Sequence, residues 1–240
     1  MPLIFLDVET TDLGEKARIV QLAYKHSETK EVVYELFRPS CEISYGSMAV
    51  HHITNEMVQG MPAFDGSVCQ KKLMELLGEN FLVAHNAAFD MSVLKTEGVA
   101  SNRFIDTLQV SKHLVESEQY SLQFLRYFLK LNVQGVSQPA AHDALADVLV
   151  LESLYDHLRN LVREKHDLSD EASIVAKMEQ LTKMPVLERF FRFGKYKGRL
   201  FSEIAEKDPK YLQWLFESEM AKPEHEQNPN LVLTLKTHLN

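Results

Sequence analysis

Four carboxylates and one histidine stand in three short segments that are far apart in the sequence: Asp7 and Glu9, then Asp90, then His142 and Asp147. Carboxylate oxygens are the ligands that Mg²⁺ and Mn²⁺ prefer in proteins. A histidine with a pKa near neutrality can accept a proton from water. Two such cations about 4 Å apart can activate water and stabilise a leaving oxygen. The combination therefore suits metal-assisted hydrolysis of a phosphodiester.

Asp7 and Glu9 are two residues apart at the end of a hydrophobic segment that predicts a strand. Alternate residues of a strand face the same side of its sheet, so both carboxylates are expected on one face. Two like charges buried side by side are costly unless cations hold them. Taken alone, the pair could instead simply end the strand at a turn.

Asp90 stands in the segment His85-Asn-Ala-Ala-Phe-Asp90, where a short buried strand passes into a helix. It could equally be an N-terminal helix residue that the helix dipole favours. Asp143 can cap the next long helix, with His142 in the loop before it. Asp147 then points inward from an otherwise apolar helical face, which is a costly position if it serves packing alone. For His142 by itself, a solvated loop histidine is the alternative.

Alternating strand-like and helical segments must position these residues. Short apolar segments predict strands at 3–8, 19–25, 31–37, 81–84 and 103–106. Helical spacing of apolar residues predicts helices at 64–78, 89–97, 107–115, 121–130 and 143–161. The apolar face of the first helix is expected to contain Phe64, Val68, Leu73, Leu76 and Leu77. The first three strands suggest an antiparallel meander, and the whole pattern predicts an α/β fold with a mixed sheet flanked by helices.

A change of composition follows the last of these helices. We expect a catalytic domain over 1–162, a linker with a short helix at 170–182 over 163–185, and a small C-terminal α+β module, a candidate DNA-binding module, over 186–240. In that module, Phe190 to Phe201 predicts a hairpin around Gly194-Lys-Tyr-Lys-Gly198, and helices are expected after it.

Length and charge limit the possible functions. The chain has 240 residues and an ordinary composition, which excludes collagen, coiled coil and wholesale disorder. Its 26 basic and 34 acidic residues give a net charge of −8, which argues against a general nucleic-acid binder. A polyanion must therefore be held by cations bound to the acidic part of the chain, or by the basic run in the C-terminal module: Arg189, Arg192, Lys195, Lys197 and Arg199.

The cellular location follows from what the sequence lacks. Cys41 and Cys69 form no metal-binding spacing and no disulfide framework, which suits a reducing compartment. No segment fits a signal peptide or a membrane span. We therefore expect a cytoplasmic protein that does not bind a membrane. The sequence does not indicate an oligomeric state.

The acidic motifs resemble those of a known family. Asp7-Val-Glu9-Thr-Thr resembles the first motif of the DEDD exonuclease superfamily, and the segment from His85 to Asp90 resembles the second. The third motif of its histidine-containing branch, which includes proofreading subunits of bacterial replicases, is similar to His142 with Asp147. The resemblance implies a ribonuclease-H-like fold, two Mg²⁺ (or Mn²⁺) ions and stepwise 3′→5′ release of nucleoside 5′-monophosphates. It also implies that the metal ligands are Asp7, Glu9, Asp90 and Asp147 and that the general base is His142.

The C-terminal module has a resemblance of its own. Phe193-Gly-Lys-Tyr-Lys-Gly198, followed by Asp208-Pro-Lys-Tyr-Leu-Gln-Trp214, is similar to the C-terminal module of the bacterial exodeoxyribonuclease X family. That family degrades single- and double-stranded DNA from 3′ ends, which favours DNA over RNA as the partner. Lys195 and Lys197 at the turn suit a phosphate backbone. The alternative is a solvated basic turn over an aromatic mini-core.

An enzyme that cuts at a strand end must also hold the terminal nucleotide. Leu13 could wedge against the terminal base, and Thr11 could meet the 3′-OH. Phe89 could pack on the sugar or base, although a core role is as plausible. His51 and His85 could approach phosphate, or could be structural hydrogen-bonding histidines.

These features lead to one main prediction and two rivals. The main prediction is a metal-dependent 3′→5′ exodeoxyribonuclease that serves DNA repair or recombination. The first rival is the same chemistry on RNA ends, as in RNA trimming or oligoribonucleotide decay. The second is a non-catalytic nucleic-acid-binding adaptor, against which all five predicted catalytic positions are filled.

Overall fold

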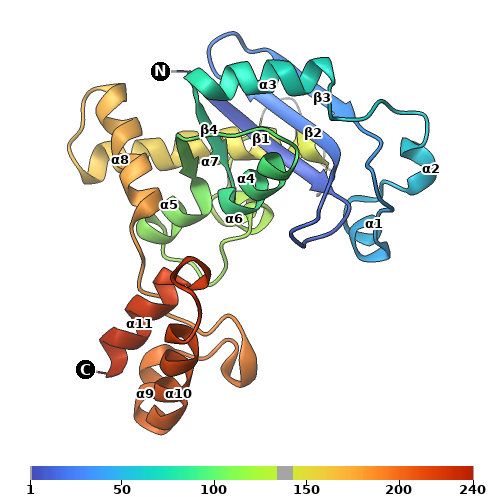
Figure 1. Ribbon diagram of the computed structural model, residues 1–240. Coiled ribbons are helices and arrows are strands. Elements are labelled where there is room, and N and C mark those ends of the chain that lie inside the picture. The colour runs from blue at the N-terminus through green and yellow to red at the C-terminus, as the bar shows by residue number, and fades with distance from the viewer. Residues whose placement is uncertain (1, 134–142, 240) are drawn as a thin grey trace. The chain divides into compact units, whose positions relative to one another are not determined.

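Five strands in the order β3-β2-β1-β4-β5 form a sheet in the computed structural model, which describes residues 2–133 and 143–239 (Figure 1). The antiparallel meander of the sequence prediction is confirmed in β1 (Leu3–Thr10), β2 (Ile19–His26) and β3 (Val32–Leu36). The strands β4 (Phe81–Ala84) and β5 (Phe104–Asp106) are parallel to β1. The predicted mixed α/β sheet is thus confirmed, with β1 at its centre.

Helices cover both faces of this sheet because β1 buries side chains on both faces. Ile4 and Leu6 contact one apolar cluster, which includes residues of α3 (Val68–Glu79) and α4 (Ala87–Thr96). Leu3 and Phe5 point to the other face and join a second cluster. This second face is covered by α5 (Thr107–Leu114), α6 (Leu122–Phe128), α7 (Ala144–Lys165) and α8 (Glu171–Lys183). Asp7 and Glu9 continue the period of Leu3 and Phe5, which places them on the α7 face.

The long helix α7 buries one apolar stripe against the sheet. Its stripe repeats every three or four residues through Leu151, Leu154, Leu158 and Val162. Asp143 is its N-cap, and the carboxylate accepts a hydrogen bond from the backbone N–H of Ala146 at 3.0 Å. The cap confirms the start that the sequence predicts for this helix.

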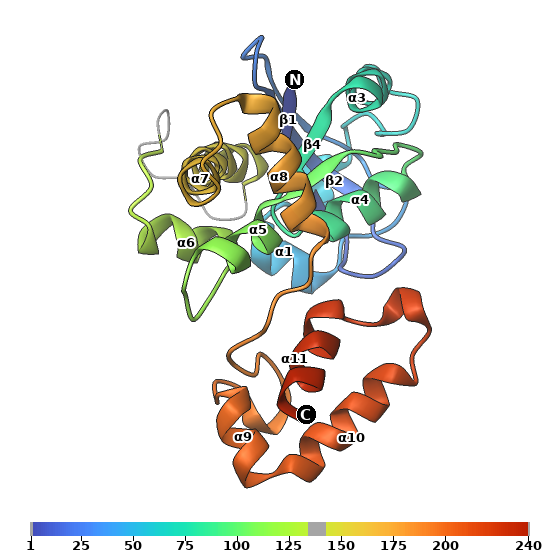
Figure 2. The same cartoon turned by 90° about the vertical axis from the view of Figure 1, so that its left-hand side faces the viewer.

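The helix predicted inside the linker packs in the N-terminal part of the chain. α8 buries Ile174, Val175 and Met178 in the same cluster as α7, and Figure 2 shows both helices on one side of the sheet. The Thr182 hydroxyl also accepts a hydrogen bond from the backbone N–H of Asp106 at 3.0 Å. The chain consequently divides into compact units at Met1–Thr182 and Lys183–Asn240, later than the end of the catalytic domain expected at 162.

The remaining helices of the first unit are α1 (Tyr45–His51) and α2 (Asn55–Val58). The helix predicted over 64–78 begins only at Val68, because the Ser67 side chain caps it by accepting from the N–H of Gln70 at 3.0 Å. Val68 is 83% exposed, so its predicted place on the apolar face was wrong. Phe64 is buried as expected, but it precedes the helix and packs edge-on against Phe37.

The second unit is helical, and the predicted hairpin is reduced to one isolated bridge between Phe190 and Leu200. A short 3-10 turn, η1 (Gly194–Tyr196), occupies the expected hairpin tip. The helices α9 (Phe201–Lys207), α10 (Pro209–Met220) and α11 (Pro229–Leu239) surround a small core, and a 3-10 turn, η2 (Glu224–Glu226), connects the last two. Phe191 stacks on Phe201 in this core, with ring centroids 3.8 Å apart. Aromatic packing therefore replaces the strand pairing that an α+β module would need.

No helix in the described part of the chain is both long and apolar enough to cross a membrane.

The substitution Met178→Ala should lower the free energy of unfolding of the first unit by about 2–5 kcal/mol, because it leaves a cavity in the shared core. Urea denaturation followed by circular dichroism measures this. Gln180→Ala, on the exposed face of the same helix, should leave the midpoint almost unchanged. Equal stability of the two variants would show that α8 is not part of the core.

Candidate active site

Three of the predicted metal ligands lie together at the end of β1. Carboxylate oxygens of Asp7, Glu9 and Asp147 are all within 4.8 Å of one another. Asp7 and Glu9 come from one face of β1, and Asp147 comes from the first turn of α7. Asp90, in the first turn of α4, lines the same cavity of about 420 Å³. Residues that are far apart in the sequence thus meet where the strand and two helices converge.

The carboxylates raise one another's pKa values. Burial raises the pKa of Asp7 well above its usual value, and the nearby charges of Asp90, Asp147, Glu9 and Asp143 raise it further. Burial and the charges of Asp147, Asp90 and Asp143 raise the pKa of Glu9 to about 8. Burial likewise raises the pKa of Asp90 to about 8, although backbone hydrogen bonds oppose the rise.

No lysine or arginine is found among the described residues that line this cavity. A crowded set of oxygen donors without a protein cation is the arrangement in which a bound divalent metal ion stabilises the ionised carboxylates. The cluster can therefore hold such an ion.

A chain of hydrogen bonds fixes the first turn of α7, which carries Asp147. The Tyr34 hydroxyl donates to Asp143 at 2.6 Å and accepts from the side-chain amide of Gln21 at 2.9 Å. The Gln21 carbonyl oxygen accepts from the backbone N–H of Ala144 at 3.0 Å. We call Gln21, Tyr34 and Asp143 the α7 anchor. It ties β2 and β3 to the helix start.

A second polar contact acts on Asp147 directly. Gln123, on α6, donates a hydrogen bond from its side-chain amide to a carboxylate oxygen of Asp147 at 2.5 Å. A neutral donor can orient a metal-binding carboxylate without competing as a cation. Sequence analysis missed Gln123, Gln21 and Tyr34, because no local pattern shows that these three residues meet α7.

The chain is similar in sequence and in structure to known proteins. The family model described as "Exonuclease" matches residues 4–155, and the model described as "Exodeoxyribonuclease X-like C-terminal" matches residues 191–219. The chain is 31% identical over 235 residues to Exodeoxyribonuclease 10 of Escherichia coli (strain K12), which covers 97% of both chains.

The chain belongs to the exonuclease family.

Its activity is accordingly that of a nuclease, a hydrolase of phosphodiester bonds. Another relative, the PolC-type DNA polymerase III of Clostridium perfringens, is 27% identical over 70% of this chain and 12% of its own length. A solved structure of Exonuclease X in complex with 5′ overhanging duplex DNA superimposes with a TM-score of 0.57 and 27% identity. It covers 74% of this chain and 99% of that one. The predicted ribonuclease-H-like fold and the predicted exodeoxyribonuclease X resemblance are both confirmed.

The predicted general base of this exonuclease, His142, lies outside the described residues. The next residue, Asp143, is the N-cap of α7.

Among the residues predicted to hold the terminal nucleotide, Leu13, Phe89, His51 and His85 line the cavity, whereas Thr11 does not. Leu13 is 82% exposed at the cavity, and Phe89 lines it while packing against the sheet cluster. Thr11 is buried outside the lining. Its hydroxyl accepts from the backbone N–H of Arg18 at 3.0 Å and its backbone carbonyl accepts from Ser44. The structure places Thr11 outside the cavity lining, and its contact with a 3′-OH stays a prediction.

Both histidines predicted to approach phosphate line the cavity, and both have ring nitrogens that contact other groups of the protein. In His51, Nε2 donates to the backbone oxygen of Thr10 at 3.2 Å and Nδ1 accepts from the N–H of Ile53 at 3.0 Å. In His85, Nε2 contacts the backbone oxygen of Tyr120 at 2.7 Å and Nδ1 contacts the Thr107 hydroxyl at 2.9 Å. These hydrogen bonds fit the alternative of structural histidines, and a contact of either ring with phosphate stays a prediction.

The two lysines predicted at the hairpin tip differ from each other. Lys195 forms an ion pair with Asp208 at 3.0 Å. Lys197 is exposed and has no ion-pair partner among the described residues. The charge of Lys195 is thus compensated within its own unit, and the phosphate contacts of both lysines stay predictions.

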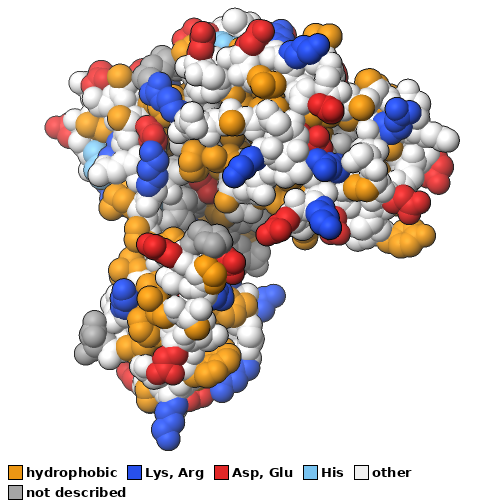
Figure 3. Space-filling view, in the orientation of Figure 1, with side chains coloured by type: hydrophobic (Ala, Val, Ile, Leu, Met, Phe, Trp, Pro, Cys, Tyr) orange, Lys and Arg blue, Asp and Glu red, His pale blue; other side chains and the backbone are white. Residues whose placement is uncertain are grey.

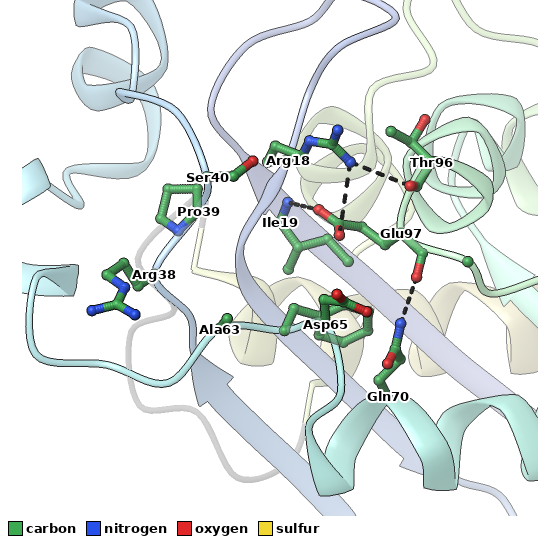
Figure 4. A pocket seen from close by; sticks show the side chains of 12 residues that line it. Arg18, Ile19, Arg38, Pro39, Ser40, Ala63, Asp65, Gln70, Thr96 and Glu97 are labelled. Carbon is green, nitrogen blue, oxygen red and sulfur yellow. Dashed lines mark hydrogen bonds and ion pairs between the residues drawn. The ribbon is translucent and has the colours of Figure 1, made fainter.

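A second cavity of about 420 Å³ lies at the far end of α4 (Figure 4). One wall is formed by Arg18, which donates to the backbone oxygen of Thr96 at 3.2 Å and pairs with Glu97 at 3.9 Å. Glu97 also accepts from the N–H of Ile19, and its backbone oxygen accepts from Gln70 at 2.6 Å. These bonds fasten the C-terminal end of α4 to β2 and α3, which stabilises the helix that carries Asp90 at its other end.

The substitution Gln123→Leu should raise the divalent-cation concentration needed for half-maximal nuclease activity by about tenfold, because it removes the donor that orients Asp147. Metal titrations of the initial rate measure this. Gln119→Leu, on the exposed loop before α6, is the matched control. A shift of equal size in both variants, or in neither, would contradict the role of Gln123.

Proposed function

We propose that this exonuclease is a 3′→5′ exodeoxyribonuclease that uses two divalent metal ions, Mg²⁺ or Mn²⁺, and releases nucleoside 5′-monophosphates. The observation that carries the proposal is the convergence of Asp7, Glu9 and Asp147 within 4.8 Å, beside Asp90 in one cavity. Hard cations prefer such all-oxygen donors. When bound, they would supply Lewis-acid stabilisation of the charge that develops on phosphate oxygens.

Each side chain of the site has its own role in the proposed hydrolysis. Asp7, Glu9, Asp90 and Asp147 hold the cations, and the α7 anchor and Gln123 keep Asp147 oriented. His142, assigned by the family resemblance, accepts the proton of the attacking water, so that hydrolysis is direct and has no covalent intermediate. Leu13 wedges against the terminal base, and Phe89 lies beside the terminal sugar or base.

DNA is the substrate that the relatives support. The curated relative of E. coli is named an exodeoxyribonuclease, and the similar Exonuclease X structure contains 5′ overhanging duplex DNA. The match in the C-terminal module extends this similarity beyond the catalytic unit. We therefore favour single- or double-stranded DNA 3′ ends over RNA ends. A role in DNA repair or recombination fits a nuclease of this type.

The absence of a disulfide between exposed Cys41 and buried Cys69 suits the cytoplasm.

The substitution Asp7→Asn should lower the hydrolysis rate by about 10³-fold or more, because several kcal/mol of transition-state stabilisation depend on the bound cations. Asp12→Asn is the matched control, since Asp12 lines the same cavity outside the carboxylate cluster.

Thermal unfolding provides an independent readout of the same variants. Metal addition should raise the melting temperature of the wild type and of Asp12→Asn. It should not raise that of Asp7→Asn, because a metal ion stabilises the folded protein only when it binds, and this variant lacks one of the ligands. A metal-induced shift of wild-type size in Asp7→Asn would contradict the assignment of this ligand.

Direction and substrate can be tested on matched DNA and RNA oligonucleotides. On 5′-labelled DNA, the enzyme should produce a ladder that shortens from the 3′ end, and the first product of 3′-labelled DNA should be a nucleoside 5′-monophosphate. EDTA should stop both reactions, because the carboxylates then lack their cations. Faster digestion of the RNA would favour the ribonuclease alternative, and early release of a 5′ label would exclude the proposed direction.

A further inference from the structure

The second unit exposes one aromatic ring of α10 and packs two partly buried tyrosines near it. Trp214, the one tryptophan of the sequence, is 58% exposed. The ring of Tyr211, one turn earlier, lies 5.6 Å from it, and Tyr211 lies 5.0 Å from Tyr196 in an edge-on contact. We call Tyr196, Tyr211 and Trp214 the aromatic step. Figure 3 shows hydrophobic side chains at the surface of this unit beside lysines and arginines.

Hydrogen bonds hold the aromatic step in place. Asp208 accepts from Lys195 at 3.0 Å, from the Tyr196 hydroxyl at 2.7 Å and from the backbone N–H of Tyr211 at 3.2 Å. The Lys195 ammonium also lies 4.6 Å and 4.5 Å from the ring centroids of Tyr196 and Tyr211. The tyrosines are therefore ordered before any ligand arrives, which reduces the entropic cost of binding.

Gly194 makes the close packing of the step possible. Its φ of +67° is one that side-chain-bearing residues rarely adopt, and a Cβ there would come within 3.0 Å of the Tyr211 hydroxyl.

Uncompensated positive charge stands next to the exposed ring. Lys210 is exposed one helical turn before Trp214, and the side-chain ammonium groups of Lys210 and Lys197 have no ion-pair or hydrogen-bond partner within residues 2–133 and 143–239. Glu217, on the following turn, accepts a hydrogen bond from Gln213 at 2.7 Å. An exposed aromatic ring beside free ammonium groups complements a nucleic-acid strand, whose bases stack and whose phosphates are anionic.

We propose that the aromatic step is a stacking site for a base of single-stranded nucleic acid, with Trp214 against the base and Lys210 and Lys197 near the flanking phosphates. This inference rests on the proposed function and specifies how the C-terminal unit would hold its substrate. Stacking on an aromatic face tolerates any base, as an enzyme that digests successive nucleotides requires. The contact surface thereby extends from the predicted hairpin tip, with Tyr196 and Lys197, to Lys210 and Trp214 of α10.

Because Trp214 is the sole tryptophan, its fluorescence reports on this site alone. The test titrates the full chain with oligothymidylate in EDTA, where hydrolysis is stopped, and follows binding independently by anisotropy of a labelled oligonucleotide. Tryptophan fluorescence should be quenched with the same midpoint as the anisotropy change. A pre-annealed blunt duplex, whose bases are already stacked on one another, should quench less.

Variants separate stacking from general effects. Trp214→Ala should weaken oligonucleotide binding by about tenfold, the effect of losing one stacked base, and Trp214→Phe should restore most of the affinity. Met220→Ala removes another exposed apolar side chain of α10 and should bind as the wild type does. Lys210→Gln should reduce the slope of log K against log salt by about 0.7.

Binding without quenching, or wild-type affinity of Trp214→Ala, would overturn the stacking site, and an unchanged salt slope would overturn the phosphate role of Lys210. Hydrolysis of very short oligonucleotides with Mg²⁺, which need not reach the second unit, distinguishes this failure from failure of the proposed function. If Trp214→Ala and the wild type both digest them while quenching is absent, only the stacking site is wrong. If the wild type digests no DNA, the proposed function itself fails.

Discussion

Repulsion among buried and half-buried carboxylates is the constraint on which the catalytic unit depends. Asp7 lies among the charges of Asp90, Asp147 and Glu9, and burial removes much of the water that would screen them. Without cations, these groups would oppose the packing that brings them together. The sheet resists this repulsion because β1, the strand that carries two of them, is hydrogen-bonded on both sides by β2 and β4. The central strand of the sheet thus carries two of the carboxylates that repel one another.

Neutral donors, rather than cations, support these carboxylates. Gln123 contacts Asp147, and Tyr34 with Gln21 holds Asp143 and the start of α7. A lysine or arginine at either place would also relieve the repulsion. It would, however, neutralise the negative charge that attracts the metal ions. Hydrogen bonds from amides and a hydroxyl orient the oxygens while leaving the negative charge available. Burial and the hydrogen bond to Asp143 raise the pKa of the Tyr34 hydroxyl to about 12. The hydroxyl therefore keeps its proton and remains a hydrogen-bond donor to Asp143.

The sequence predicts correctly those site residues whose positions depend on local geometry, such as the period of a strand or the cap of a helix. The period of β1 predicts that Asp7 and Glu9 share a face, and the Asp143 cap predicts the inward position of Asp147. Contacts with residues far away in the sequence are beyond the reach of such patterns. The sequence leaves open whether His51 and His85 approach phosphate or serve the structure, and no local pattern shows that their Nε2 atoms contact the backbone oxygens of Thr10 and Tyr120. The predicted hairpin likewise gave way to ring stacking with a helix that follows it.

In the second unit, the number of basic residues overestimates the positive charge that is available to a polyanion. The basic run that the sequence displays is largely compensated inside the unit: Arg192 pairs with Glu188, Lys195 with Asp208, and Arg199 with Glu203. Such pairs are weak in water, but they fix where each side chain points. The charge left for a polyanion is therefore small, and electrostatics alone would hold a strand loosely. Base stacking would then supply much of the affinity. Because every nucleotide offers an aromatic face and a phosphate, the same contacts would form again when the strand advances after each hydrolysis.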